Sequence, residues 1–190
     1  MGYKKIIGKR IYLSPISSNN YKLYTEWVND FEVMLGLSLN KRVITEESQK
    51  SFLESSSGNK YDFGIIALES DKLIGNVGFT SVDQINRKAT VGIFIGDKEY
   101  WNDGYGGEAL SLLLDFGFNV LNLNSINLTV FEYNKPAIRC YEKIGFKEAG
   151  RLREAVIAGG QKFAEIEMDI LAREFESPVL NDILNKRMNR

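Results

Sequence analysis

The sequence predicts a fold of the α+β class, and three observations lead to this prediction. Residues 61–68, 73–82 and 89–95 are close-set strands separated by short turns, which indicates an antiparallel meander. Helices and strands then alternate from residue 104 to residue 153. Residues 162–171 finally alternate apolar and charged side chains, which is typical of a strand with one buried and one exposed face.

Length and composition are those of an ordinary globular protein. The 190 residues predict one domain, or one with a short extension, because domains average about 150 residues. Hydrophobic residues make up 44% and charged residues 26%, which excludes a disordered chain and a collagen-like fibre. The formal net charge of -1 lacks the basic excess of a general nucleic-acid-binding protein, so we expect no nucleic-acid partner.

The chain contains no histidine and a single cysteine, Cys140. The absence of imidazole excludes Ser-His-Asp and Cys-His catalysis and histidine-ligated zinc or iron sites. One cysteine can form neither an internal disulfide nor a thiolate metal cluster, and we expect no metal cofactor. Catalysis by carboxylates, hydroxyls, amines or backbone amides is left, or no catalysis at all.

No targeting segment is evident in the sequence. The first residues lack the apolar core of a signal peptide, and Ile6 stands where a myristoylation signal needs Ser or Thr. No apolar run approaches the roughly 20 residues that cross a bilayer. We therefore expect a cytoplasmic protein with no membrane partner.

The first sixty residues are predicted to contain one strand and two helices. The strand and the helices are expected at residues 9–14, 20–29 and 46–55. Pro15 ends the strand, the first helix has apolar side chains at helical spacing, and Thr45 caps the second helix. Residues 30–42 and 55–59 are predicted to be irregular.

After the meander, a long helix is predicted over residues 104–121. It is apolar nearly all round, so we expect it to be deeply buried. The elements expected after it are strand 125–131, helix 135–144 and the two strands 146–153 and 162–171. Asn134, Pro136 and Gly145 suit the cap, the first turn and the end of the second of these helices.

The last segment, residues 177–190, is predicted to be a helical tail that follows the main domain, residues 1–176. Ser177 can cap this helix and Pro178 can be its first residue. A narrow apolar stripe is formed by Leu180, Ile183, Leu184 and Met188. The stripe predicts packing on the chain's own domain or, alternatively, a dimer contact, so the chain is a monomer or a homodimer.

The most informative segment is a glycine-rich stretch, residues 100–109, where extended chain becomes helix. Gly104, Gly106 and Gly107 let backbone amides approach a ligand closely, and a helix N-terminus adds about half a positive charge. Such a place binds phosphate without a lysine. The alternative is structural, namely that the glycines make a tight turn and allow close packing.

A dinucleotide site is a second alternative for the same loop. Gly104-x-Gly106-x-x-Ala109 fits the fingerprint G-x-G-x-x-G/A, and Glu132 ends the next strand, where a ribose-binding acid can lie. That reading predicts an oxidoreductase that binds NAD. The fingerprint requires the strand to run straight into the first glycine, however, and residues 96–103 intervene here.

Two motifs together resemble the GCN5-related N-acetyltransferase (GNAT) superfamily. The acetyl-CoA loop of that superfamily reads Q/R-x-x-G-x-G/A, and this chain has Trp101-x-x-Gly104-x-Gly106. The later motif, N-x-x-A/S-x-x-x-Y-x-x-x-G-F, is matched by Asn134, Ala137, Tyr141, Gly145 and Phe146. The loop is similar to that of the branch holding the ribosomal-protein N-terminal and the spermidine N-acetyltransferases. The resemblance covers about residues 9–174.

The resemblance implies a mixed, strongly twisted sheet of about seven strands flanked by helices, to which this chain adds a C-terminal helix. Two central strands, residues 89–95 and 125–131, would splay apart, and the pantetheine arm would pair with the first of them. The implied activity is acetyl transfer from acetyl-CoA, as co-substrate, to a primary amine of a protein N-terminus or a small molecule. A CoA-binding module without turnover is a further alternative.

The resemblance also assigns residues to the site. The cofactor-binding set is Phe94, Ile95, Trp101, Asn102, Asp103, Gly104, Tyr105, Gly106, Gly107, Asn134 and Ala137. A backbone N–H near Phe94 or Ile95 would stabilise the oxyanion, and Tyr141 would be the general acid that protonates the leaving thiolate. The residues expected in the acceptor wall, or equally in a plain core cluster, are Trp27, Phe31 and Met34.

No general base is evident from the sequence. Relatives that acetylate polyamines carry a glutamate early in the first splayed strand, where this chain has Thr90, and this departure argues against a polyamine acceptor. Glu26, Glu32 and Glu132 are expected to be solvated surface charges. A chain of water molecules leading to backbone carbonyls could do the same work.

Overall fold

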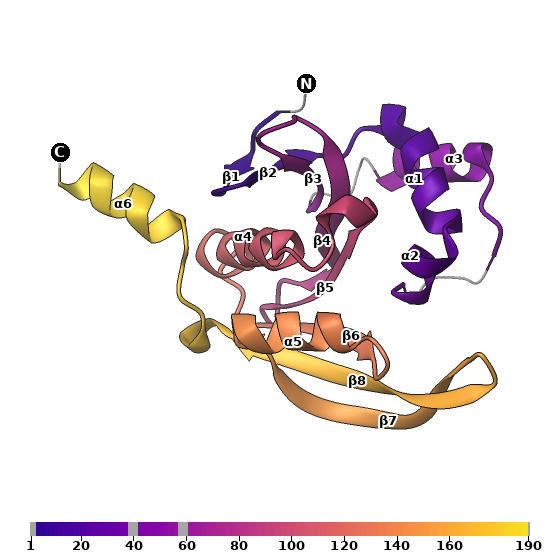
Figure 1. The fold of residues 1–190 in the computed structure, drawn as a ribbon. Helices are drawn as coiled ribbons and strands as arrows, with labels where there is room; N and C mark the ends of the chain where they lie inside the picture. Colours follow the sequence, from indigo (N-terminus) through magenta and orange to yellow (C-terminus); the bar gives the residue numbers. More distant parts are fainter. Residues whose placement is uncertain (1–2, 38–41, 57–60, 190) are drawn as a thin grey trace. The chain divides into compact units, whose positions relative to one another are not determined.

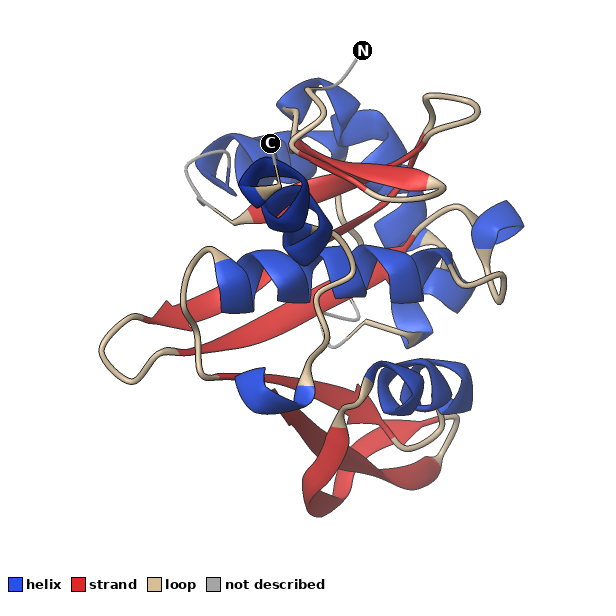
Figure 2. Ribbon diagram, turned by 90° about the vertical axis from the view of Figure 1, so that its left-hand side faces the viewer, coloured by secondary structure: helices blue, strands red, loops and turns tan. Residues whose placement is uncertain are grey.

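The computed structural model describes residues 3–37, 42–56 and 61–189. Its strands form a sheet in the order β1-β2-β3-β4-β5-β6-β8-β7, and helices lie in several of the segments that connect the strands along the chain (Figures 1 and 2). The strands are β1 (Ile6–Ile7), β2 (Ile11–Pro15), β3 (Asp62–Ala67), β4 (Leu73–Asp83), β5 (Lys88–Ile95), β6 (Ser125–Phe131), β7 (Lys147–Ala158) and β8 (Gln161–Leu171). The helices are α1 (Tyr21–Asn29), α2 (Phe31–Leu35), α3 (Glu46–Ser56), α4 (Tyr105–Asn119), α5 (Lys135–Ile144) and α6 (Leu180–Met188). The predicted mixed α+β sheet is confirmed.

The chain divides into two compact units. Unit 1 consists of Met1–Gly78 and Ile93–Ala109, and unit 2 of Phe79–Gly92 and Leu110–Arg190. Strands β4 and β5 and helix α4 therefore contribute residues to both units. Among the described residues, no helix has both the length and the apolar character that a membrane crossing requires.

Unit 1 differs from the sequence prediction at two places. The two-residue strand β1 pairs with β2, so the sheet has eight strands rather than about seven. The prediction of an irregular segment at residues 30–42 is wrong for α2, because the Asp30 carboxylate accepts hydrogen bonds from the Glu32 and Val33 amides and caps a short helix. Residues 38–41 of that segment, and residues 57–60 of the predicted loop, lie outside the described residues.

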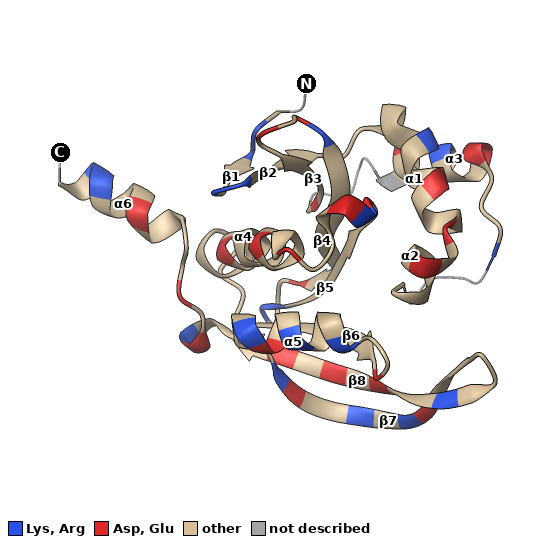
Figure 3. Cartoon of the chain, in the orientation of Figure 1, with Lys and Arg blue, Asp and Glu red and all other residues tan. Residues whose placement is uncertain are grey.

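Unit 2 confirms the patterns on which its prediction rested. The α4 residues Leu110, Leu112, Leu113 and Leu114 are at most 2% exposed, as expected for a helix that is apolar all round. On β8 the apolar residues Ala164, Ile166, Met168 and Ile170 are buried. Charged residues of both signs occupy other positions on β7 and β8 (Figure 3), which is the expected pattern for a sheet with one solvated face.

The N-terminus of α6 is held by Asp115 of α4, a carboxylate that is 3% exposed. Its Oδ1 accepts a hydrogen bond of 2.7 Å from the Ser177 hydroxyl, and its Oδ2 accepts bonds of 3.0 Å from the Val179 and Leu180 amides. The predicted capping residue Ser177 also accepts a hydrogen bond of 3.1 Å from the Asn181 amide, and the helix begins at Leu180 and not at Pro178.

The apolar stripe on α6 does not pack as first expected. The side chains of Ile183, Leu184 and Met188 are 46%, 48% and 82% exposed. The expectation that these three residues pack on the chain's own domain is therefore wrong. A homodimer contact through this face stays a prediction.

Asp115→Asn is expected to lower the free energy of unfolding by about 2 kcal/mol, because a neutral amide replaces the buried carboxylate that accepts three hydrogen bonds from Ser177, Val179 and Leu180. We also expect faster trypsin cleavage at Lys186 and Arg187, since α6 loses its cap. Asp182→Asn, at an exposed acidic residue of the first turn of α6, is the matched control. Equal cleavage rates in both variants would contradict this role of Asp115.

Candidate active site

The glycine loop of unit 1 follows β5 and ends where α4 begins. After a short 3-10 helix, Lys98–Tyr100, the Trp101 indole Nε1 donates a hydrogen bond of 2.8 Å to the Ile95 carbonyl oxygen. Asn102 and Gly104 have left-handed backbone conformations, with φ of 57° and 82°. Trp101, in the position where the GNAT motif has Gln or Arg, therefore fastens the loop to the end of β5.

The start of α4 is the place where the sequence predicts an anion-binding site. The first amides of a helix have no acceptor within the helix and carry the positive end of its dipole. Gly104 has a positive φ, which disfavours other residues, so the turn alone is enough to explain a glycine at this position. A Cβ added at Gly106 would lie 3.6 Å from Ile95 Cγ1, an ordinary contact, so neither packing nor φ requires glycine there. Glycine at position 106 instead keeps the first turn of α4 clear of a side chain.

The end of β5 packs on an aromatic cluster from α1. The Trp27 ring lies edge-on to those of Tyr24 and Phe94, with centroids 5.4 and 6.1 Å away. Trp27 is 7% exposed and its ring lies against Gly96, where an added Cβ would be 2.1 Å from it. Of the expected acceptor-wall residues, Trp27 thus belongs to the core of unit 1. Phe31 is 69% exposed, and Met34 is half-buried.

Unit 2 contains the residues of the second motif on and around α5. The Asn134 side-chain oxygen accepts a hydrogen bond of 3.3 Å from the Ala137 amide and caps the helix. Gly145 ends the helix with φ of 114°, a conformation that a side chain would disfavour. The sequence predicted both caps. These residues belong to unit 2, whereas the glycine loop belongs to unit 1.

Tyr141 lies on α5 with its ring centroid 6.0 Å from that of Phe146. Burial, with a smaller contribution from Cys140, raises the pKa of the Tyr141 phenol to about 12. The phenol therefore keeps its proton over the whole range in which an enzyme is assayed. Burial also raises the pKa of the neighbouring Cys140 thiol, so it is not a nucleophilic thiolate at neutral pH.

The carboxylates considered as general bases are exposed or already engaged. Glu132 accepts hydrogen bonds from the Ala164 amide at 3.0 Å and from Arg151 Nη1 at 2.8 Å, and these contacts lower its pKa. Glu32 is paired with Lys98, and Glu26 is exposed. A carboxylate with a lowered pKa accepts a proton poorly, so Glu132 is a weak candidate for the base.

The β5–β6 pairing is short. In the described part of the chain the parallel ladder runs from Lys88–Ser125 to Thr90–Asn127, although β5 continues to Ile95. At the last of these pairs, the Thr90 hydroxyl donates a hydrogen bond of 3.1 Å to the Asn127 side-chain oxygen. Thr90 therefore ties the two strands together and supplies no base.

The comparison with known proteins agrees with this geometry. The family model described as an acetyltransferase (GNAT) domain matches residues 10–147. The chain is 36% identical to the "uncharacterized N-acetyltransferase p20" of Bacillus licheniformis over 64% of this chain and 67% of that protein. It is 29% identical to the spermidine N(1)-acetyltransferase of Escherichia coli K12 over 83% of this chain and 78% of that protein.

The fold agrees as well. A spermidine N-acetyltransferase from Vibrio cholerae, crystallised with CoA and spermine, superposes with a TM-score of 0.79 at 22% identity, over 88% of this chain and 98% of that one. The class that fold and motifs define is therefore the N-acetyltransferases. The chain belongs to the GNAT acetyltransferase family.

Proposed function

We propose that this chain transfers the acetyl group of acetyl-CoA to a primary amine by direct attack on the thioester. The observation that carries the proposal is the start of α4, where Gly106 places no side chain over the first turn and Trp101 fixes the loop to the end of β5. A diphosphate is the cofactor group that the first amides of a helix hold best. The family match favours this reading over the NAD-dependent oxidoreductase.

The reaction requires a neutral amine, because only the nitrogen lone pair can attack the thioester carbonyl carbon. The C–N bond forms, the carbonyl oxygen becomes an oxyanion, and a backbone N–H near Phe94 or Ile95 stabilises it. The C–S bond then breaks and the CoA thiolate leaves. The proton lost by the nitrogen balances the proton gained by the sulfur, and Tyr141 is the proposed group between them.

The raised pKa of Tyr141 defines its part in this step. Its phenol, at about 12, is a weaker acid than a thiol with a pKa of ~8.5. Full proton transfer from Tyr141 alone is therefore uphill. We infer that the Tyr141 hydroxyl donates a hydrogen bond to the departing sulfur. As the phenol proton moves to the sulfur, the proton lost by the attacking nitrogen replaces it on the Tyr141 oxygen.

The acceptor is proposed to be a protein N-terminus or a small-molecule amine. The spermidine N(1)-acetyltransferase relative makes polyamines the first amines to try. Residue 90, where polyamine-acetylating relatives have glutamate, is a threonine that bonds to Asn127, so this position has no carboxylate. We therefore expect spermidine to rank below amines of lower charge in a panel assayed by thiol release.

Titration of the purified chain with CoA in a calorimeter is expected to give saturable binding with a Kd between about 1 μM and 1 mM, and no comparable heat with NAD. Gly106→Ala should weaken CoA binding about fivefold, because the added methyl group obstructs one amide. Gly150→Ala, at a position with only an ordinary contact at 3.8 Å, is the control. No heat from CoA with the folded wild-type chain would overturn the proposal, and CoA binding without thiol release for any amine would favour the module without turnover.

A further inference from the structure

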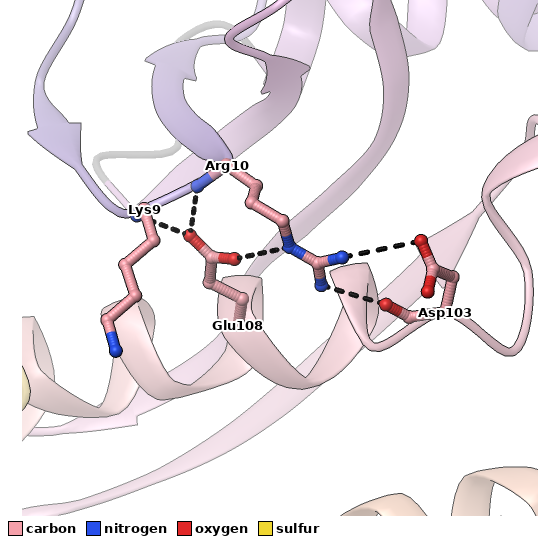
Figure 4. A network of polar contacts seen from close by, with 4 residues as sticks. All are labelled: Lys9, Arg10, Asp103 and Glu108. Carbon is pink, nitrogen blue, oxygen red and sulfur yellow. Dashed lines mark hydrogen bonds and ion pairs between the residues drawn. The ribbon is translucent and has the colours of Figure 1, made fainter.

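Arg10 lies outside both sequence motifs, and its guanidinium reaches the glycine loop (Figure 4). Its Nη2 donates a hydrogen bond of 2.8 Å to the Asp103 carbonyl oxygen, and its Nη1 lies 3.3 Å from the Asp103 carboxylate. Its Nε donates to Glu108 Oε2 at 3.4 Å, and its carbon Cζ lies 4.2 Å from the centre of the Tyr105 ring. One side chain thus contacts the loop on both sides of Gly104.

The contact with the Asp103 carbonyl sets the direction of the next amide. In a trans peptide the C=O and the following N–H point in opposite directions. Because Arg10 holds the Asp103 oxygen on its own side, the Gly104 N–H points away from the guanidinium. Arg10 also lies close enough to Gly104 that an added Cβ would be 3.2 Å from Nη2. The guanidinium and any ligand of the Gly104 amide therefore occupy opposite faces of this peptide.

Arg10 also compensates the negative charges beside the amides. Asp103 precedes the helix and Glu108 lies in its first turn, where their charges would repel a diphosphate. Glu108 Oε1 accepts hydrogen bonds from the Lys9 and Arg10 amides at 2.6 and 2.9 Å, so the carboxylate is drawn to the β1–β2 turn. The guanidinium then neutralises part of both charges.

We propose that Arg10 is a positioning residue for cofactor binding: it aims the Gly104 amide and offsets the charges of Asp103 and Glu108, and so prepares the loop for the diphosphate. The inference rests on the proposed function. The Arg10 side chain is 43% exposed, and ion pairs this exposed add little to stability. Its effect should therefore appear in cofactor affinity rather than in the unfolding transition.

Arg10→Ala is expected to raise the Kd for CoA about tenfold in calorimetry. Arg10→Lys keeps the charge but not the planar fork, so an increase of about threefold is expected. Arg87→Ala is the matched control. Arg87 Nε likewise donates a hydrogen bond, of 2.6 Å, to a loop carbonyl oxygen, that of Asn122, which has a positive φ. The Kd of Arg87→Ala should equal that of the wild type.

Phosphorus NMR of CoA bound at saturation gives a readout that a purely structural role would not move. Arg10→Ala should shift the diphosphate resonances of bound CoA and leave that of the 3′-phosphate in its wild-type position. Unchanged diphosphate resonances, or an unchanged Kd, in Arg10→Ala would overturn the inference. The proposed function is tested separately, because it requires only that the wild type binds CoA. Should Arg10→Ala not fold, Arg10→Lys takes its place, and a Kd and diphosphate resonances equal to those of the wild type would overturn the inference.

Discussion

Tyr141→Phe is expected to slow thiol release about a hundredfold at saturating acetyl-CoA, because the departing sulfur loses its proton donor. The substitution removes only the hydroxyl, so the ring stays against Phe146 and the fold is retained. The KM for acetyl-CoA should change little, since the donor acts as charge develops on sulfur and not in the ground state. Steady-state release of free thiol, with the best amine of the panel, measures both quantities.

The pH dependence separates the acid from the amine. A general acid acts only while it holds its proton, and burial raises the pKa of Tyr141 to about 12. The wild-type rate should therefore rise with pH as the acceptor amine loses its proton, without a falling limb below about pH 10. Tyr133→Phe, at another tyrosine of unit 2 whose pKa burial raises, is the matched control and should leave the rate unchanged. A rate in Tyr141→Phe equal to that of the wild type would remove this residue from the mechanism.

The parts of the fold that the sequence predicted are those specified by neighbours in the chain. The Asn134 cap bonds an amide three residues away, and Gly145 alone sets the end of α5. Apolar side chains likewise recur at every second residue of β8, so the order of residues in the sequence is enough to predict which face is buried. Local signals of this kind need no knowledge of the tertiary structure.

The missed features depend on partners distant in the chain. Arg10 and Glu108 are 98 residues apart, and nothing in the spacing of either one marks the pair. The predicted Ser177 cap is present, because its hydroxyl accepts a hydrogen bond of 3.1 Å from the Asn181 amide, but the Val179 and Leu180 amides are bonded by Asp115, more than sixty residues earlier in the chain. The glycine motif located the candidate loop, whereas the side chain that holds it became visible only in the structure.

Gly75→Ala is expected to lower the free energy of unfolding by about 3 kcal/mol, and the Tm by roughly 6–12 °C for a chain of this length. A Cβ at this position of β4 would lie 2.2 Å from the Phe94 carbonyl oxygen and 2.9 Å from the Ile95 Cα. Both atoms belong to the backbone of β5, so no rotamer change relieves the clash and the strand itself must move.

Phe94 and Ile95 also belong to the proposed cofactor-binding set, so Gly75→Ala protein that still folds should bind CoA more weakly. Gly150→Ala, whose added Cβ meets only Glu167 Oε2 at 3.8 Å, should change stability by less than about 0.5 kcal/mol. Thermal unfolding followed by circular dichroism compares the two variants. A Gly75→Ala transition at the temperature of the Gly150→Ala control would mean that β4 and the end of β5 are not in the close backbone contact on which the geometry of the proposed oxyanion donors depends.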